Sequence, residues 1–402
     1  SILSDTSLGE KTDDIILNIP LPTGPYTKVT TTAIDENHNE IYSVDRDVDF
    51  NIRRFHGRRM AYSLTEVLTD SMQLVVAVGD DTGWTFRIQF AKYSSYPADL
   101  ELEWGDDNTS YVSAGTNVED YLDNITHSYA SPGDYTITIT ATREGKGPMI
   151  PAYRTREENG QWVEYMLKSA PTPLLPMNVG EYYDGLFYNC FSLERICADL
   201  FSKNPQITYL SQTFYNCHQL QEIPAGLLNY LPDLEHLEHT FAIENIGSYI
   251  HSVKQGILSS GIPEDLFANN PKLKSVTYAF EGCDGISHIP ENLFANNPEI
   301  ISFQCCFLRC SGINEPIPSN LFVNQIDAEN FAGVFSDCSG LYGSIPEDLF
   351  ATNTKAVIFD GVFRGCSGLT GVIPENLFAV HPFAADFQET FAGCSGLTGG
   401  IP

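Results

Sequence analysis

Apolar residues return in the same block every 27 or 28 residues over the second half of the chain, from about residue 176 to residue 402. One marker of the block, Ile-Pro-x-x-Leu-Phe, begins at Ile262, Ile289, Ile317, Ile345 and Ile373. A second marker, Phe-x-x-Cys, keeps the same period. Such a period is typical of a solenoid, because one unit cannot bury its own apolar face and must stack on its neighbours. The pattern predicts about eight stacked coils over residues 176–402.

Within one repeat, apolar or small residues fall at i, i+3, i+4 and i+7, as at Phe359, Val362, Phe363 and Cys366. This spacing is one face of a helical turn. The glycine-punctuated stretch Leu369–Pro374 is expected to be a short strand. A proline is tolerated at the first position of a helix, where its missing N–H needs no partner, so a second short helix is expected to follow. Each coil is predicted to hold one strand and two helical turns, which makes the solenoid α/β.

The repeat is interrupted once. Between Ile223 and Ile262 the spacing grows to 39 residues, which predicts a protruding loop near Ile243–Ser259. Phe241 keeps the period across this break, although Glu244 stands where the marker has a cysteine.

The combined motif Phe-x-x-Cys-Ser-Gly-Leu-Thr-Gly-x-Ile-Pro-Glu-Asn-Leu-Phe runs from Phe363 to Phe378. It resembles the BspA-like leucine-rich repeats of bacterial surface proteins, and the resemblance covers about residues 175–402. The repeats of this chain are longer than is usual for that family. The resemblance implies display at a cell surface and a role in adhesion, and it identifies no ligand.

Residues 71–145 lack this period and instead alternate apolar and polar residues, which is typical of strands that are buried on one face. The alternating segments are Gln73–Val78, Thr85–Gln89, Leu100–Trp104 and Tyr135–Ile139. They predict a small all-β sandwich.

Three ordered blocks in that region read Glu-Trp-Gly-Asp-Asp from Glu103, His-Ser-Tyr from His127 and Pro-Gly-Asp-Tyr-Thr-Ile from Pro132. Together they resemble a PKD-like, immunoglobulin-type domain, which implies an extracellular spacer. The chain is therefore expected to be multidomain, with this sandwich ahead of the solenoid.

Two further regions complete the expected organisation. Residues 1–70 form a β-rich segment with strands expected at Ile15–Leu21 and Ile41–Ile52. Whether this segment is an independent domain is left open. Residues 146–175 are rich in proline and are expected to be the linker, or the entry into the solenoid.

Seven of the ten cysteines occupy one position of the repeat and are expected to form one buried row next to a row of phenylalanines. These are Cys190, Cys217, Cys283, Cys310, Cys338, Cys366 and Cys394, with Phe280, Phe307, Phe335, Phe363 and Phe391. The spacing between neighbouring coils would permit disulfides. However, stacked parallel side chains point the same way, and a free cysteine packs as a small hydrophobe. Reduced, structural thiols are predicted, with Cys305 as the most reactive one.

The formal net charge of −30 argues against nucleic-acid binding, which requires a basic surface. The arginines near His56, at positions 53, 54, 58 and 59, are interpreted as a solvated loop or strand end.

No run of about 18 apolar residues occurs, so no transmembrane segment is expected. Because the sequence opens at Ser1 without a leader, a removed signal segment is expected. The predicted location is extracellular or at a bacterial cell surface, with a lipid anchor in an outer membrane as one option.

Candidate chemical sites all have a plainer structural interpretation. Glu235–His239 holds two histidines and two glutamates, but its histidines are three apart, whereas adjacent ligands on a helix need a spacing of four. Asp106 and Asp107 are expected to form a structural turn, since calcium needs six to eight oxygens. One column of acids after the repeat proline is expected to reflect helix starts rather than a calcium row. That column comprises Glu264, Glu291, Glu347 and Glu375.

No nucleophile motif, cofactor loop or metal set stands out, so no enzyme, cofactor or metal site is predicted. The expected function is binding or adhesion, in which the solenoid presents a lateral surface to a protein partner or host surface. The alternative is glycan capture beside a polysaccharide-degrading system. Candidate sugar platforms, most of them expected to be core, are Trp84, Trp104, Trp162, Tyr93, Tyr96, Tyr182 and Tyr183. The ligand, the binding face and the oligomeric state stay open.

Overall fold

The computed structural model describes a large part of the chain. The described residues are 29–34, 40–46, 60–63, 71–79, 85–88, 100–112, 125–141, 166–175, 185–244 and 258–401. Their regular elements are all β-strands. Within these ranges no helix is long and apolar enough to cross a bilayer.

A six-stranded sheet lies at one end of the described structure, in the order β11-β10-β4-β9-β6-β7. Its strands are β4 (Ser71–Val78), β6 (Leu100–Glu103), β7 (Thr109–Val112), β9 (Gly133–Ala141), β10 (Leu167–Ala170) and β11 (Arg195–Ile196). Alternate residues of β4, beginning with Met72 and Leu74, are buried. Strands β4, β6 and β9 overlap segments whose alternation predicted strands.

A second layer is formed by β5 (Thr85–Ile88) and β8 (Ile125–Ser128), which pair antiparallel. Phe86 of β5 is fully buried. The ring of His127 in β8 stacks on Trp104, which follows β6, with the ring centroids 4.8 Å apart. These contacts hold the two-stranded layer against the six-stranded sheet.

The N-terminal region contributes a separate three-stranded sheet. It consists of β1 (Val29–Ile34), β2 (Glu40–Arg46) and β3 (Met60–Ser63), in the order β2-β1-β3. Strand β2 overlaps the predicted strand Ile41–Ile52. The predicted strand Ile15–Leu21 lies outside the described residues.

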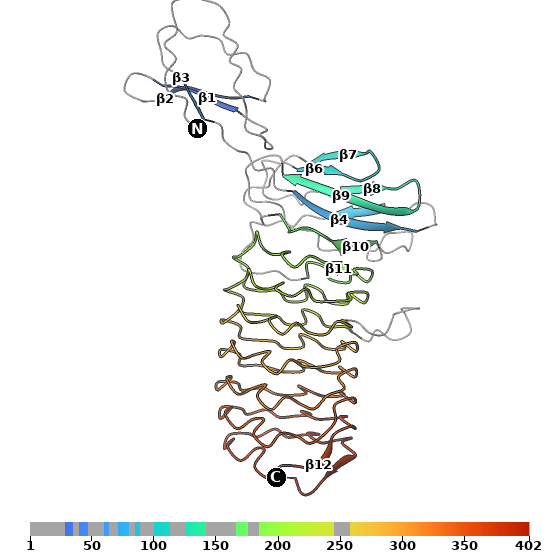
Figure 1. Ribbon diagram of the computed structural model, residues 1–402, viewed down its shortest axis with the longest axis vertical. Helices are drawn as coiled ribbons and strands as arrows, with labels where there is room; N and C mark the ends of the chain where they lie inside the picture. Colours follow the sequence, from blue (N-terminus) through green and yellow to red (C-terminus); the bar gives the residue numbers. More distant parts are fainter. Residues whose placement is uncertain are drawn as a thin grey trace, which may run out of the picture.

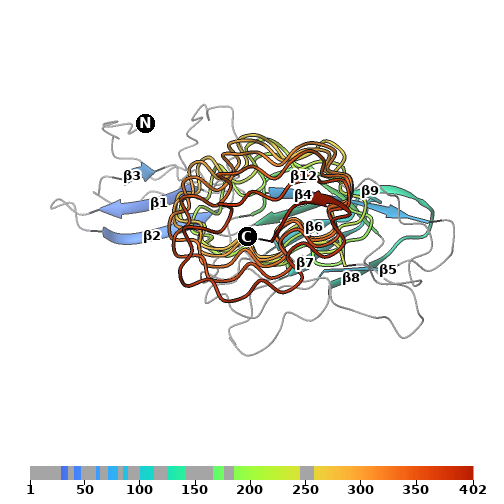
Figure 2. The same cartoon turned by 90° about the horizontal axis from the view of Figure 1, so that it is seen from below.

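From residue 185 onward the chain winds into successive coils, which we call the coil stack (residues 185–244 and 258–401). Neighbouring coils form a parallel bridge at the same repeat position, at Tyr209↔His236, His236↔Ser275, Ser275↔Ser302, Ser302↔Asn330, Asn330↔Ile358 and Ile358↔Asp386. Figure 1 shows the coils following one another along the long axis, and in Figure 2 they superpose when they are viewed along that axis.

The Phe-x-x-Cys segment of each coil is not helical, which corrects the first predicted helical turn. In the coil of Phe363, the residues two before and two after it, Gly361 and Gly365, have φ of 59° and 71°. Their N–H groups and that of Phe363 donate to carbonyls of the following coil rather than along a helix. A left-handed residue ends a helix, so the i, i+3, i+4 spacing arises from two consecutive turns. Non-glycine residues such as Asn216 and His239 take the same conformation in other coils.

The segment after the repeat proline is also a single turn rather than the second predicted helix. The N–H of Leu377 bonds to the carbonyl of Pro374 at 3.2 Å, as expected for a tight turn. Two coils have a short strand just before this position, β12 (Thr370–Val372) and β13 (Gly396–Thr398), and the two strands pair in parallel. Strand β12 falls inside the predicted strand Leu369–Pro374.

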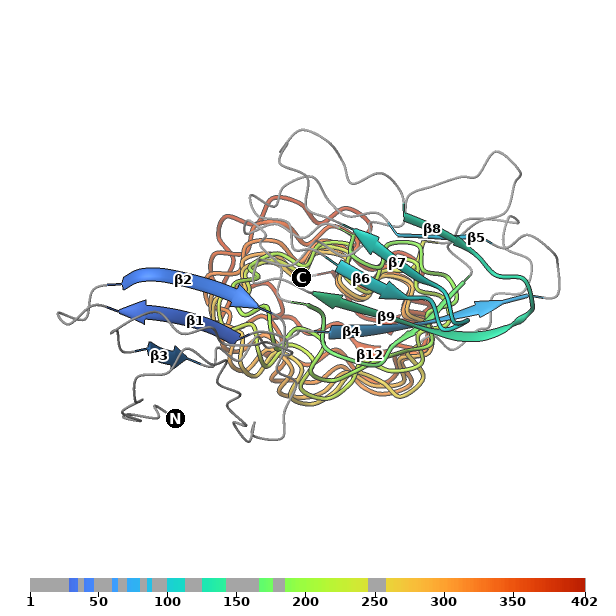
Figure 3. The same cartoon turned by 90° about the horizontal axis from the view of Figure 1, so that it is seen from above.

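The six-stranded sheet continues directly into the coil stack. Strand β10 lies within the stretch 146–175 and pairs antiparallel with β4 and parallel with β11 of the first coil. The N–H of Ala77 donates to Met166 at 2.7 Å, and the N–H of Glu194 donates to Lys168 at 2.8 Å. In Figure 3 the strands β4, β9, β6 and β7 lie side by side over this end of the stack. The sheet therefore covers the first coil and provides the stack with a cap.

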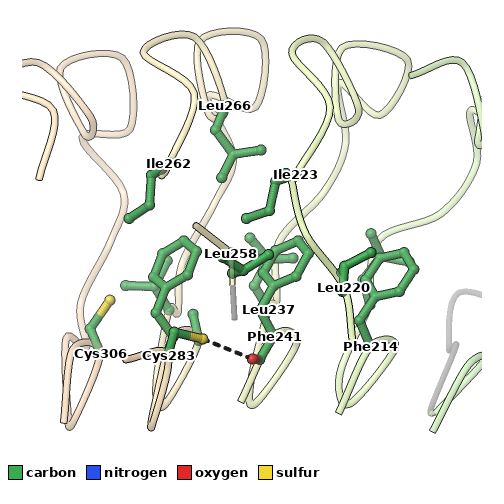
Figure 4. Close-up of a cluster of buried hydrophobic side chains, with 14 of the residues drawn as sticks. Phe214, Leu220, Ile223, Leu237, Phe241, Leu258, Ile262, Leu266, Cys283 and Cys306 are labelled. Carbon is green, nitrogen blue, oxygen red and sulfur yellow. Dashed lines mark hydrogen bonds between the residues drawn. The ribbon is translucent and has the colours of Figure 1, made fainter. Parts of the chain in front are cut away.

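The interior of the coil stack is filled from two opposite sides. Figure 4 shows Phe214 and Phe241 entering from the Phe-x-x-Cys side, and Ile223, Ile262 and Leu266 entering from the Ile-Pro side. Successive repeat phenylalanines stack nearly parallel, with centroids 5.7 Å apart for Phe241 and Phe280. One hydrophobic cluster runs from the sheet to the last coils without a break.

Candidate functional site

The seven cysteines of the repeat position are all buried thiols. Six of them donate a hydrogen bond from Sγ to the carbonyl of the repeat phenylalanine in the preceding coil, at 2.8–3.2 Å. The pairs are Cys217 to Phe187, Cys283 to Phe241, Cys310 to Phe280, Cys338 to Phe307, Cys366 to Phe335 and Cys394 to Phe363. Figure 4 marks the bond of Cys283. Thiol donors thus link one coil to the next.

Burial sets the reactivity of these thiols. It raises the pKa of each row cysteine from Cys217 onward, so the unreactive protonated form dominates at neutral pH. Two cysteines, Cys197 and Cys305, are only half-buried. Burial raises the pKa of Cys197 to about 12. Burial also raises the pKa of Cys305, against a hydrogen bond with Tyr278 that lowers it.

A second buried polar row was missed by the sequence analysis. In five coils an amide side chain reaches back to carbonyls of the preceding coil, from Asn204, Asn270, Asn297, Gln325 and Asn353. For example, Nδ2 of Asn297 donates to Phe267 at 3.0 Å and to Asn270 at 2.8 Å. The available signal was the second asparagine of Phe-Ala-Asn-Asn-Pro, which recurs at the repeat period. Both rows are structural in character.

The segment Glu235–His239 does not gather into one site. Glu235 pairs with Lys274 at 2.7 Å, while His236 Nδ1 lies 2.8 Å from Glu238. His239 faces Glu281 of the next coil at 3.6 Å. Among the described residues, no group of three or more histidine, cysteine or acidic side chains could hold a metal ion.

The half-buried Asp106 turn is tied to β8 of the second layer. Asp106 Oδ2 lies 2.7 Å from Nε2 of His127, and its pKa is lowered because hydrogen bonds from His127 and Asn108 outweigh the opposing effect of burial. Trp104 is fully buried and donates its indole N–H to Ser110 at 2.8 Å. This tryptophan is a core residue and offers no sugar platform.

The acidic column after the repeat proline is exposed and bridged by amides. Asn320 donates to Glu291 at 3.2 Å, and Asn376 donates to Glu347 at 3.4 Å. Because these acids stand at single turns, the helix-start explanation for them is wrong. For Glu291 and Glu347, an amide of the following coil is the hydrogen-bond partner instead.

Several named candidates fall outside the described residues. They are the arginines at positions 53, 54, 58 and 59, together with Trp84, Trp162, Tyr93, Tyr96, Tyr182 and Tyr183.

One surface of the coil stack combines aromatic and charged side chains over its whole length. It is formed by the exposed and half-buried side chains of an eight-residue segment in each coil, which runs from the bridge residue to the second residue after the repeat phenylalanine. We call this surface the lateral face. Its segments are 209–216, 236–243, 275–282, 302–309, 330–337, 358–365 and 386–393. Its backbone is fixed by the coil-to-coil hydrogen bonds described above.

Half-buried aromatic rings of the first coils stack from coil to coil on the lateral face. Tyr215 stacks on Tyr188 of the preceding coil at 5.1 Å between centroids. His239 meets Tyr215 edge-on at 6.0 Å and stacks on Tyr278 at 4.5 Å. A parallel stack joins Tyr209 and His236 at 4.3 Å. The rings form a continuous strip, and the hydroxyl groups of Tyr215 and Tyr278 hydrogen-bond to Glu244 and Gln304.

Carboxylates lie between these rings. Glu238 accepts a hydrogen bond from Ser211 at 2.9 Å. Burial opposes its ionisation, but hydrogen bonds from His236 and Ser275 outweigh burial and lower the pKa of Glu238. Tyr215 donates to Glu244 at 3.0 Å. Burial, followed by this bond, raises the pKa of Tyr215, so its hydroxyl stays a donor at neutral pH.

The later coils carry a different surface. At the position two before the repeat phenylalanine, where earlier coils have His239 and Tyr278, Gly333 and Gly361 project no side chain. Asp360 lies near Asp386 and Glu389, and burial together with these like charges raises the pKa of Asp360. The lateral face therefore changes from aromatic to acidic along the stack.

The comparisons with known proteins assign no function to the lateral face. No family model matches the chain, and no curated protein matches it. One similar solved structure is that of the Toll–Spatzle complex, described as a molecular hub in Drosophila development and innate immunity. The similarity has a TM-score of 0.18 and 14% identity, over 57% of this chain and 38% of that chain. This chain thus spans well under half the length of that protein. At this TM-score the likeness carries no argument about fold or function.

Proposed function

We propose that the chain is a non-enzymatic binding protein of a bacterial cell surface, and that the lateral face of a leucine-rich-repeat solenoid contacts a protein partner. The observation that carries the proposal is the strip of stacked rings of Tyr188, Tyr215, His239 and Tyr278. Tyrosines on a rigid backbone supply large contact area at a low entropic cost, and they are enriched at the centres of protein interfaces. The six-stranded sheet covers the first coil, so we expect it to hold the lateral face at a fixed angle.

The alternative partner, a glycan, is supported less well by the same rings. Sugars pack their C–H groups on the open faces of aromatic rings. Tyr215 and Tyr188 lie nearly parallel, with 11° between their planes, and His239 and Tyr278 with 6°. Each of these rings therefore has one face covered by its neighbour, which leaves less open ring surface for a sugar. Edges and hydroxyl groups suit side chains and backbone of a protein better than a sugar ring.

Binding to a panel of matrix and cell-surface proteins, run beside a glycan array, tests the proposal. We expect protein binding that falls at least tenfold in a Tyr215→Ala/Tyr278→Ala double variant. The matched control is Tyr230→Ala, since Tyr230 is an exposed tyrosine of the coil stack outside the lateral face. Glycan binding that is lost in the double variant, with no protein bound, would establish the alternative. Equal loss in the control would disprove a role for the lateral face.

A further inference from the structure

The charge of the lateral face indicates the chemical class of the partner in the proposed function. Its seven segments hold six carboxylates, at Glu238, Glu281, Asp337, Asp360, Asp386 and Glu389. They hold two guanidinium groups, at Arg309 and Arg364. The face therefore carries a net negative charge along its length.

Both guanidinium groups are already paired on the face. Arg309 lies 2.5 Å from Glu281, and Arg364 lies 2.9 Å from Glu389. These pairs leave Asp337, Asp360 and Asp386 as the excess charge, whereas Glu238 already pairs with His236. No cation of the face is left over to meet an acidic partner. A partner that brings lysine or arginine would complement the excess charge and would also meet the ring edges of the first coils.

The dimensions of the stack set the length of such a partner. The seven segments of the lateral face, together with Tyr188 in the coil before them, extend over eight coils. Neighbouring paired segments lie about 4.8 Å apart, so seven steps span about 34 Å, and an extended chain covers this span with about ten residues at about 3.3 Å each.

We infer that the lateral face binds an extended, basic segment of a protein, about ten residues long, which runs across the coils along the stack. The segment lies over the aromatic strip of the first coils and places its cationic side chains against the carboxylates, above all those of the later coils. This inference rests on the proposed function and specifies the chemistry of its partner.

Fluorescently labelled decapeptides with alternating arginine and serine, or alternating glutamate and serine, test it by anisotropy with the full chain. We expect the arginine peptide to bind, the glutamate peptide not to bind, and the affinity to fall as salt rises, because salt screens these charges. Asp337→Asn/Asp360→Asn and Tyr215→Ala/Tyr278→Ala should each weaken binding at least fivefold. Tyr215→Phe keeps the ring, so it should bind nearly as well as the unchanged protein.

The matched control is Glu347→Gln/Glu375→Gln, which removes the same amount of charge from the acidic column outside the lateral face. This variant should bind the arginine peptide as the unchanged protein does. Equal weakening by the control, or equal binding of the glutamate peptide, overturns the inference. If no basic peptide binds while Tyr215→Ala/Tyr278→Ala still abolishes binding of a matrix protein, the inference fails and the proposed function stands.

Discussion

The six-stranded sheet and the coil stack pair their backbone groups in two different ways. Strands β4 and β9 match residue for residue over the whole of β4, from Ser71 to Val78. Most neighbouring coils share only one bridge, and left-handed residues on both sides of the repeat phenylalanine interrupt the pairing. Cysteine and amide side chains add further coil-to-coil bonds. In the sheet, side chains serve mainly for packing, whereas in the stack their polar groups also connect the layers.

The largest effect that separates the two regions is expected from Phe307→Ala. Phe307 is fully buried between Phe280 and Phe335, so the truncation should cost about 3–5 kcal/mol through the cavity it leaves. The three tryptophans lie at residues 84, 104 and 162, outside the coil stack. In urea unfolding, the midpoint followed by circular dichroism should therefore fall. The midpoint followed by tryptophan fluorescence should change less. Leu308→Ala, at a half-buried neighbour, is the control, and its midpoint should move far less.

The next effect concerns the strand that joins the two regions. Leu167 of β10 is fully buried, and Leu167→Ala should cost about 2–4 kcal/mol. Because β10 pairs with both β4 and β11, we expect circular dichroism and tryptophan fluorescence to shift together. The control is Lys168→Ala, whose side chain is partly exposed. A shift in only one of the two probes would show that β10 does not couple the two regions.

A smaller effect is expected from the second buried polar row, formed by the amide side chains that bond to the preceding coil, which we call the amide row. Asn297→Leu removes two hydrogen bonds to the preceding coil, and a net loss of about 1–3 kcal/mol should follow. The adjacent Asn296 is exposed and donates only one bond, at 3.2 Å. Asn296→Leu should lie within about 0.5 kcal/mol of the unchanged protein in urea unfolding. If the two variants were equally stable, amide side chains would not connect the coils as proposed.

The smallest effect is the contribution of one buried histidine to the pH dependence of stability. His381 occupies the position of the amide row and is buried, and burial lowers its pKa below 6.5. The unfolded chain therefore takes up a proton that the folded chain resists, so the stability present above about pH 6.5 declines as the pH falls. His381→Gln should flatten this decline in melting temperature between pH 7.5 and 5.5. Gln325 shows that glutamine fits the position. Parallel profiles would assign the decline to other groups.

The sequence predicted the layout of the molecule better than its local geometry. The repeat phenylalanine recurs at the spacing of the bridges between coils, and the alternation around Leu74 falls in β4. The helical turns were wrong, because left-handed residues such as Gln212 and Glu389 carry no reliable sequence signal. Strand β10 was missed because four residues in a proline-rich stretch show too little alternation.

The lateral face was predicted only as an unspecified surface. Its aromatic strip joins Tyr215 and His239, which belong to different coils and to different positions of the repeat. Their contact depends on the lateral offset between neighbouring coils. The repeat period contains no information about that offset, so the strip could be found only from the structure.

The direction of the coil-to-coil hydrogen bonds has a mechanical consequence. In each coil the N–H groups near the repeat phenylalanine donate to the following coil, as Phe335 does to Val362 and Phe363 does to Thr390. These bonds lie along the stacking direction, so a pull applied between the two ends loads successive coils in series. The coil with the fewest such bonds should yield first. Under tension the chain would lengthen stepwise, by about one 27–28-residue coil at a time.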